Sequence, residues 1–372
     1  MKAAALRPAG RAIPRWQGPG GDLAARLGRD VAWLDSGTAA LALAIQLSMA
    51  ETGASRVLLP AYGCPDLLAA VLHAGATPVL LDTRPDTPFL DPADVRAAGG
   101  GVAAVLAVHL LGMPEDLDAL DGACVAIGAV LVEDSAQLVP RPGDSLPKAA
   151  LAVYSFGRGK PAGALGGGAL ASSPSWRGRV PGDFAAPRHR FAGRARVAIR
   201  RAGYNALIRP LPYGLVNRLP GTGLGETRYV PLRAIEPLDA ALVPVIAAVL
   251  AGVPTAATEP QRAIAAAMQL LAGRIDDLAL RCGQGRPLPR YPILMAERAS
   301  RDAALAELRR AGLGASAMYG RVLPELEGVP QLAGGALPNA RSFADRLLTL
   351  PVHEDVGPEH VERMMAVLER YA

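Results

Sequence analysis

The chain has 372 residues, of which 51% are hydrophobic and 20% are charged, and its formal net charge is +5. This length and composition are typical of a soluble globular protein with a large core and room for two domains. So modest a positive charge gives no reason to expect a nucleic-acid partner.

The cysteines and the apolar stretches indicate a cytoplasmic protein. Cys64, Cys124 and Cys282 are odd in number and far apart, which argues against a disulfide framework and against a zinc cluster. Residues 1–15 contain no apolar run long enough for a signal peptide. Residues 240–251 are strongly apolar, but they contain Pro244 and are too few to span a bilayer. We therefore expect a cytoplasmic protein without a metal site.

Residues 1–30 are rich in Gly and Pro and are expected to be irregular. From residue 31, short apolar segments alternate with helical patterns, which is typical of a mostly parallel sheet covered on both faces. The expected strands are residues 31–34, 57–60, 78–82, 103–109, 129–132 and 149–154, and the expected helices are residues 39–49, 65–74 and 117–127. The sequence thus predicts an α/β domain over residues 31–257, with functional residues at the carboxyl ends of its strands.

The alternation stops between about residues 181 and 237, where arginines are interleaved with apolar residues. Residues 191–208 have the pattern of a basic amphipathic helix. Such a helix is either a solvated surface element or a contact for a membrane surface or an anionic substrate. A long helix over residues 259–280 is expected to lead into a smaller α+β domain, so that the second domain spans residues 258–372. Its expected elements are a strand at residues 292–295 and helices at residues 301–311, 340–348 and 358–371.

The first motif, Ser36-Gly37-Thr38, lies where a strand meets a helix. Free backbone N–H groups, the helix dipole and two hydroxyls at such a point suit a phosphate group. The same three residues are also an ordinary helix cap, and this motif alone does not decide between the two interpretations.

The second motif, Glu133-Asp134-Ser135-Ala136-Gln137, follows a buried strand directly. A carboxylate there needs a cation or hydrogen-bond donors to remain ionised. A protonated pyridine nitrogen meets that need for Asp134, and Gln137 can reach another edge of the same ring. Taken by itself, the motif favours Asp134 as the cap of a following helix.

The third motif runs from Ser155 to Lys160 and is followed by Gly163, Gly166, Gly167 and Gly168. A lysine held away from bulk water has a lowered pKa, and its neutral amine can attack a carbonyl to form an imine. Ser155 offers a further phosphate ligand. The alternative is a tight turn whose lysine points to solvent. Together, however, the three motifs supply a phosphate site, a partner for a pyridinium and an imine-forming amine, which is what pyridoxal 5'-phosphate requires.

At these residues the sequence resembles the DegT/DnrJ/EryC1/StrS family of sugar aminotransferases. The resemblance covers about residues 31–169 and resumes from about residue 305 to the C-terminus. The third motif aligns without gaps to the family's Ser-Phe-x-x-x-Lys-x-x-Gly-x-x-Gly-x-Gly-Gly pattern, with Gly167 and Ala169 at two altered positions. Further matching positions are Pro60, Asp82, His109, Gly112, Pro114, Asp116, Tyr319 and the segment Leu350-Pro351-Val352-His353.

The resemblance implies fold type I of the pyridoxal-phosphate enzymes, with a large α/β/α domain and a smaller C-terminal domain. It implies that Lys160 is the Schiff-base lysine and proton carrier, and that Asp134 holds the pyridine nitrogen protonated. Gln137 would contact the ring near its 3-oxygen, and the phosphate would be held by Gly37, Thr38 and Ser155. The implied reaction transfers an amino group from an amino acid such as glutamate to a nucleotide-linked keto-sugar, in the synthesis of surface polysaccharides or secondary metabolites. The resemblance also implies a homodimer with active sites at the subunit interface.

Two positions depart from the family pattern. Cys64 stands where the family has an aromatic residue that stacks on the cofactor ring, with Tyr62 or His109 as partial substitutes. The family's Tyr-Asn-x-Arg segment, whose Asn reaches the phosphate of the neighbouring subunit, has no clear match near residues 225–240. Both changes bear on the substrate and leave the chemistry expected of Lys160 intact.

Three other functions remain open on the sequence alone. A sugar dehydratase shares the fold, but Lys160 argues against it, because the dehydratases of this family have histidine there. A regulatory protein that binds pyridoxal phosphate without turnover is compatible with the two departures. The arginine-rich segment 188–209 is compatible with a module that binds membrane surfaces or nucleic acid, in addition to an enzyme or instead of one.

Overall fold

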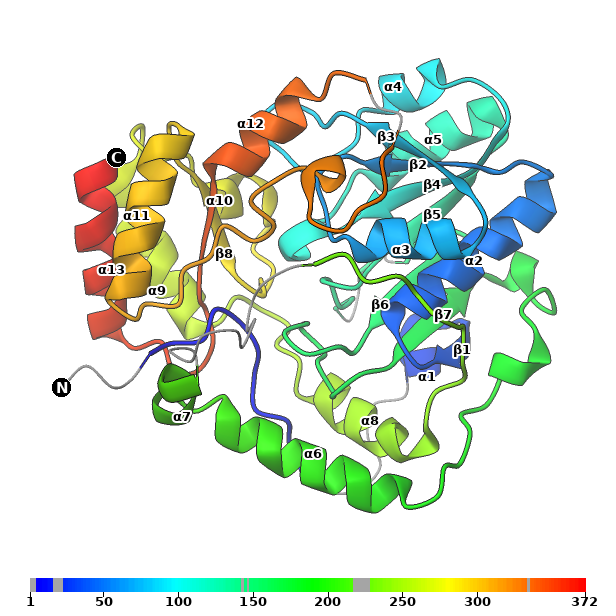
Figure 1. Cartoon of the computed structure of the whole chain (residues 1–372), viewed down its shortest axis with the longest axis horizontal. Coiled ribbons are helices and arrows are strands. Elements are labelled where there is room, and N and C mark those ends of the chain that lie inside the picture. The colour runs from blue at the N-terminus through cyan, green and yellow to red at the C-terminus, as the bar shows by residue number, and fades with distance from the viewer. Residues whose placement is uncertain (1–4, 16–22, 142–143, 146, 217–227, 333–334) are drawn as a thin grey trace.

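The computed structural model describes residues 5–15, 23–141, 144–145, 147–216, 228–332 and 335–372 (Figure 1). The strands are Asp30–Leu34 (β1), Arg56–Pro60 (β2), Thr77–Leu81 (β3), Val102–Val108 (β4), Val130–Asp134 (β5), Leu151–Ser155 (β6), Gly168–Ser172 (β7), Tyr291–Leu294 (β8) and Leu347–Leu350 (β9). The α-helices are Leu23–Leu27 (α1), Gly37–Thr52 (α2), Asp66–His73 (α3), Pro92–Ala97 (α4), Leu117–Ile127 (α5), Gly193–Leu207 (α6), Pro210–Val216 (α7), Val243–Ala251 (α8), Glu259–Met268 (α9), Leu278–Cys282 (α10), Arg298–Arg310 (α11), Pro338–Arg346 (α12) and Pro358–Tyr371 (α13).

One sheet holds seven strands in the order β1-β7-β6-β5-β4-β2-β3. β7 runs antiparallel to both of its neighbours, β1 and β6, and the other neighbouring pairs are parallel. Side chains alternate between the two faces of a strand, so a sheet covered on both faces is built from continuous apolar strands. β4 is the clearest case, since all seven of its residues are buried. The mostly parallel sheet predicted from the sequence is confirmed.

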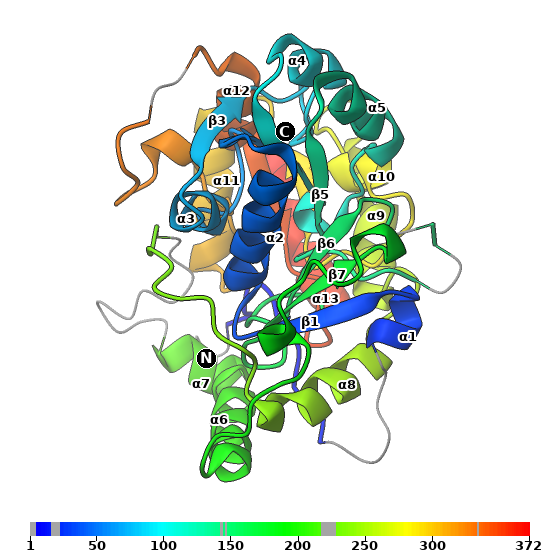
Figure 2. The ribbon, with the colours of Figure 1, turned by 90° about the vertical axis from the view of Figure 1, so that its right-hand side faces the viewer.

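Helices cover both faces of this sheet, and the alternating side chains of β4 show it directly. Ala104, Leu106 and Val108 belong to the hydrophobic core that includes α2. Val105 and Ala107, which point to the opposite face, belong to the core that includes α5. The two helices therefore lie on opposite sides of the sheet (Figure 2), and the sheet presents its strand ends, rather than a face, to a ligand.

The C-terminal part of the chain is a smaller α+β unit. β8 and β9 form an antiparallel pair, and α9, α11 and α13 pack beside them. Figure 1 shows this group, in yellow to red, at one side of the large sheet. The prediction of a smaller α+β unit in this region is confirmed in its elements, whereas the exact boundary at residue 258 stays a prediction.

The prediction of one long helix over residues 259–280 is wrong. α9 ends at Met268 and is followed by a single 3-10 turn, Gln269–Leu271. Gly273 then adopts a φ of +79°, a left-handed conformation that interrupts a helix and favours glycine. α10 begins anew behind Asp277, whose carboxylate accepts a hydrogen bond of 2.9 Å from the backbone N–H of Leu280.

Two smaller expectations also need correction. The helix expected at residues 340–348 ends at Arg346, because Leu347–Leu350 pair with β8 as the strand β9. Residues 1–30 were expected to be irregular, yet Leu23–Leu27 form the short helix α1, with Leu23 buried. The rest of the irregular prediction falls partly on residues 1–4 and 16–22, which lie outside the described residues.

Candidate active site

The candidate phosphate-binding residues meet where β6 ends and α2 begins. A Cβ atom added to Gly37 would lie 2.6 Å from the Cβ atom of Ser155, so the first turn of α2 lies directly against Ser155. A Cβ atom on Gly168 would lie 2.2 Å from the carbonyl oxygen of Ser36, which only glycine permits. The positive end of the α2 dipole and the Ser155 hydroxyl are thereby brought to one place.

Ser36 takes the ordinary role of a helix cap. Its side chain accepts a hydrogen bond of 3.1 Å from the backbone N–H of Ala39. The capping interpretation is therefore right for Ser36, and its hydroxyl is engaged within the protein. Gly37, Thr38 and Ser155 are each half-buried at the same helix end, where they remain candidates for holding a phosphate.

Asp134 ends β5, next to β6 in the sheet, and only 8% of it is exposed. Its Oδ1 atom accepts a hydrogen bond of 2.9 Å from the backbone N–H of Ala136. The residues after it form a turn, so Asp134 does not cap a following helix. Burial raises the pKa of the Asp134 carboxyl, and the bond from Ala136 and the charge of Lys160 oppose that rise. A further cation that approaches this buried carboxyl would stabilise its ionised form.

Lys160 is half-buried and lies within electrostatic range of both Asp134 and Cys64. The loop is compact, because the N–H of Lys160 bonds to the carbonyl of Gly157 and its own carbonyl accepts a bond from Gly163. A Cβ atom on Gly157 would lie 3.6 Å from the Ser155 hydroxyl and 3.9 Å from Cγ of Lys160. The loop thus brings the start of the Lys160 side chain close to Ser155, and the expectation that its amine faces the cofactor rather than solvent stays a prediction.

Gln137 and Cys64 face a tyrosine from the C-terminal unit. The Gln137 side chain accepts a bond of 3.0 Å from the N–H of Leu111 and donates one of 3.3 Å to the hydroxyl of Tyr319. Burial raises the pKa of Tyr319 well above its ordinary value, and the neighbouring thiol of Cys64 adds to this. Burial likewise raises the pKa of Cys64 to about 11, so its thiol is neutral and unreactive near pH 7.

The two residues considered as substitutes for the missing stacking residue are occupied elsewhere. Tyr62 is 1% exposed, and its ring packs against those of Tyr319 and Phe343, with centroids 5.6 and 5.0 Å apart. His109 is fully buried, with its Nδ1 atom bonded to the N–H of Glu115 and its Nε2 atom 3.2 Å from the carboxylate of Glu133. Both side chains therefore support the site from within the protein.

Glu133 anchors the strand that carries Asp134. Its carboxylate is fully buried, which disfavours the ionised form, but the nearby His109 ring opposes this effect, and the Ser135 hydroxyl and the backbone N–H of Lys148 donate to the carboxylate. These donors together lower the pKa of Glu133 below its ordinary value. The alternation of β5 thus turns one carboxylate inward as a structural anchor and leaves its neighbour, Asp134, beside the lysine.

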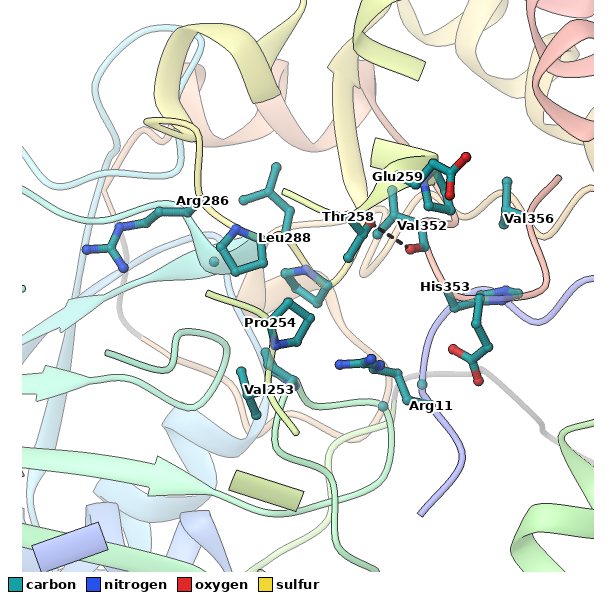
Figure 3. A pocket seen from close by; sticks show the side chains of 18 of the residues that line it. Arg11, Val253, Pro254, Thr258, Glu259, Arg286, Leu288, Val352, His353 and Val356 are labelled. Carbon is teal, nitrogen blue, oxygen red and sulfur yellow. Dashed lines mark hydrogen bonds between the residues drawn. The ribbon is translucent and has the colours of Figure 1, made fainter. Parts of the chain in front are cut away.

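A cavity of about 490 Å³ meets the site at Gly159–Pro161 and extends toward the C-terminal unit. Arg286 lies at one end and His353 and Val356 at the other, with Pro254 and Thr258 between them (Figure 3). Asp134, Gln137 and Cys64, all of which the structure describes, do not line it. The cavity is therefore an extension of the site beside Lys160, and sequence patterns gave no indication of it.

A second hollow, of about 440 Å³, lies at the phosphate end. Thr38 and Asp66 line it together with residues 230–234, the region where the family's Asn segment has no clear match. The ring of His73 donates a hydrogen bond of 2.9 Å to the carbonyl of Leu232, which fastens this segment to α3 of the same chain. Arg233 is the cation lining this hollow among the described residues. The start of the sequence stretch that replaces the family segment, residues 224–227, lies outside the described residues.

The described residues contain no group of three or more His, Cys, Asp or Glu side chains arranged to hold a metal ion. In the same part of the chain, no helix combines the length and hydrophobicity needed to cross a bilayer.

The mostly parallel sheet, with Lys160, the buried Asp134 and the N-terminus of α2 at one of its edges, is typical of a fold-type-I transferase. The chain belongs to the DegT/DnrJ/EryC1/StrS aminotransferase family, whose model matches residues 23–174 and 261–369. The resemblance inferred from the motifs is thus confirmed, and pyridoxal phosphate (PLP) is the cofactor of the family's aminotransferases.

Two relatives and one structure illustrate the similarity. The erythromycin biosynthesis sensory transduction protein EryC1 of Saccharopolyspora erythraea is 38% identical over 35% of this chain and 38% of its own length. The dTDP-4-dehydro-2,3,6-trideoxy-D-glucose 4-aminotransferase of Saccharopolyspora spinosa is 38% identical over 28% of each chain. The PLP form of Spr1654 from Streptococcus pneumoniae matches 99% of this chain and 100% of that one, with a TM-score of 0.69 and 20% identity. The sequence alignments thus span about a third of the relatives, whereas the fold is shared throughout.

Proposed function

We propose that this protein is a PLP-dependent aminotransferase that moves an amino group from an amino acid such as glutamate to a keto-sugar, with a nucleotide-linked sugar as the first acceptor to test. The observation that carries the proposal is the buried Asp134 beside Lys160, next to the junction of β6 and α2. Family membership and the sugar aminotransferase named among the relatives support the reaction class and the type of acceptor.

The residues present fit the cofactor. Gly37, Thr38 and Ser155 supply backbone N–H groups and hydroxyls for a phosphate at the helix end. When bound, PLP supplies a carbonyl that captures amines and a ring that withdraws electrons from the carbon losing a proton. Asp134 would hold the proton on the ring nitrogen, and the charge gained there would offset the burial that raises the pKa of the carboxyl.

Lys160 has two roles in this proposal. Its Nζ atom would hold the cofactor covalently until the amine of the donor displaces it. The freed amine, beside the carboxylate of Asp134, would then carry a proton between two carbon atoms. Gln137 would be positioned toward the ring by its bonds to Leu111 and Tyr319.

Cys64 would replace the stacking aromatic side chain. A neutral, half-buried thiol can pack its polarizable sulfur against an aromatic ring, although with less contact area than an aromatic residue. We therefore expect weaker retention of the cofactor than an aromatic residue would give, and unchanged chemistry at Lys160.

The second candidate is a protein of the same fold that binds PLP and regulates rather than catalyses. The change at Cys64 favours it, as does the description of EryC1 as a sensory transduction protein. A dehydratase is disfavoured by Lys160.

In the aminotransferase proposal, the functional unit is a homodimer in the cytoplasm, with a neighbouring subunit completing the site.

The test is the visible spectrum of the purified protein with PLP, before and after glutamate is added. The aminotransferase proposal predicts a band of lysine-bound PLP that bleaches on addition of the donor. A band that persists with every amino donor would support the regulatory candidate, and the absence of a band would contradict both. The chain has three lysines, Lys2, Lys148 and Lys160, so reduction with borohydride and peptide mapping identifies the attachment site, with Lys148→Ala as the matched control.

A further inference from the structure

Helix α6 turns an apolar face to solvent. Ala195, Ile199, Ala202 and Ala206, which we call the α6 stripe, recur at helical spacing, and all of them are exposed. Ile199 is 72% exposed, and Phe191, just before the helix, is 99% exposed. The opposite face is buried through Val197. A surface helix of a globular protein normally shows the reverse pattern, with polar residues toward water.

Arginines border the α6 stripe on both sides. Arg194 and Arg201 lie on one flank, and Arg196 and Arg200 lie on the other. Arg196 pairs with Asp239 at 2.9 Å, whereas Arg194 has no hydrogen bond or ion pair to any residue that the structure describes. No Asp or Glu occurs from residue 191 to residue 209. The exposed face is therefore apolar at its centre and bordered by arginines, of which Arg196 is paired with Asp239.

The location of α6 leaves this face accessible. Figures 1 and 2 both show α6 at the outer edge of the molecule, with α7 following it. Among the described residues, eight large hydrophobic side chains are strongly exposed, and four of them lie within residues 191–215: Phe191, Ile199, Leu211 and Leu215. This concentration is far above the scattered exposure that is normal for a protein surface.

α6 is also firmly attached to the rest of the protein. The side chain of Asn205 accepts from the backbone N–H of Ile13 and donates to its carbonyl, each at 2.9 Å. Arg200 donates to the carbonyl of Leu165 at 2.8 Å, close to the loop that carries Lys160. Whatever binds the α6 stripe therefore fixes the orientation of the whole molecule.

We propose that Phe191 and the α6 stripe dock this protein onto the surface of an anionic lipid bilayer. The helix would lie in the plane of the interface, with Ile199 and Phe191 among the acyl chains and the arginines at the headgroups. A second copy of the chain is a poorer partner, because a two-fold pairing of α6 would place arginines against arginines, and the helix itself carries no Asp or Glu to meet them. Nucleic acid would satisfy the arginines but would leave the apolar centre without a partner.

The test is co-sedimentation of the full-length protein with vesicles of phosphatidylcholine alone or mixed with phosphatidylglycerol. We expect binding to the mixed vesicles that weakens as salt is raised, and little binding to phosphatidylcholine alone. The double variant F191S/I199S should lose more than about tenfold in binding, since it removes both large inserted side chains. Arg194→Gln should lose roughly fivefold, as expected for one juxtamembrane charge.

Matched controls are Val125→Ser and Leu270→Ser, which remove apolar side chains that are 74% and 83% exposed elsewhere on the surface. Thermal unfolding and the PLP spectrum establish that each variant is folded, and they keep this test independent of the aminotransferase proposal. Equal binding to neutral vesicles, or unchanged binding of F191S/I199S, would overturn the proposal. It would also be overturned if F191S/I199S lowered the oligomeric state, which would make the stripe a contact between copies, or if DNA bound the protein and lipid did not.

Discussion

The two ends of the candidate cofactor site are built in different ways. The phosphate end consists of Gly37, Thr38 and Ser155, which come from one helix start and one adjacent strand end. The ring end combines Asp134 and Lys160 from the large sheet with Tyr319 from the C-terminal unit, through Gln137 and Cys64. The phosphate end combines backbone N–H groups with hydroxyls, whereas the ring end consists of side chains, of which Asp134 is buried and the others are half-buried. We therefore expect mutations at the ring end to change chemistry and those at the phosphate end to change affinity.

The largest expected effect is at Lys160. Lys160→Ala removes both the covalent link to the cofactor and the proton carrier, and should lower the rate of the glutamate half-reaction by about 10³-fold or more. Thermal unfolding should change little, because Lys160 is only half-buried. The rate is measured from the conversion of PLP to its amine form on addition of glutamate, with Lys148→Ala as the control. Near-normal turnover in Lys160→Ala would contradict the whole assignment of the ring end.

At the ring end, Asp134→Asn removes the negative charge of the side chain but keeps its size and shape. Loss of a charge-assisted bond to the ring nitrogen should weaken PLP binding by about tenfold to a hundredfold, and turnover should fall with it. Asp118→Asn, at a carboxylate that is 78% exposed, is the matched control.

In the cofactor-free protein, Asp134→Asn should not be harmful, because its effect on stability is opposite to its effect on PLP binding. Because burial raises the folded-state pKa of Asp134, the folded protein binds this proton more tightly than the unfolded chain does. The stabilisation that this proton provides is present at low pH and is lost as the pH rises through the folded-state pKa. Asp134→Asn should therefore be as stable as the parent, or more stable, at pH 7 without PLP, with a smaller dependence on pH. A loss of stability in denaturant titrations would show that Asp134 is primarily structural.

The difference between the two ends also explains what could be predicted from the sequence. Ser36-Gly37-Thr38 is a local pattern at a strand-to-helix junction, and the structure shows the expected helix N-terminus there. Asp134 and Lys160 follow apolar strands, and parallel strands bring such ends together. By contrast, the bond from Gln137 to Tyr319 joins residues 182 positions apart, which no local spacing encodes.

The same limit applies to the fold. Six of the seven strands of the large sheet were predictable because they are short apolar runs between turns, whereas β7 is not among the expected strands. β9 was missed because Leu347–Leu350 have an apolar pattern that fits the end of a helix equally well, and only pairing with β8 decides it. The break after α9 depends on Gly273, which ends the helical stretch, and on Asp277, which caps the next helix. The prediction followed the helical periodicity of residues 259–280 and gave these two residues too little weight.

At the phosphate end, Ser155→Ala removes one hydroxyl from a site that keeps its backbone donors. PLP affinity should fall by about tenfold, the lower end of the range for one hydrogen bond to a charged group, and the rate at saturating cofactor should stay close to that of the parent. Ser173→Ala, at an exposed hydroxyl bonded to Ser175, is the control. A large loss of turnover at saturating PLP would mean that Ser155 acts on the chemistry, and the division between the two ends would fail.

Tyr319→Phe tests the link between the two parts of the chain and should have the smallest effect. It deletes the hydroxyl that accepts the 3.3 Å bond from Gln137 but keeps the ring packed on Tyr62. One neutral hydrogen bond contributes about 0.5–1.5 kcal/mol, so turnover should fall by roughly twofold to tenfold while PLP affinity stays the same. Gln137→Ala in the Tyr319→Phe background should then add little, because both changes break the same bond. If Tyr319→Phe instead cost as much as Lys160→Ala, the hydroxyl would itself be a proton donor in the reaction, and the C-terminal unit would supply catalysis as well as positioning.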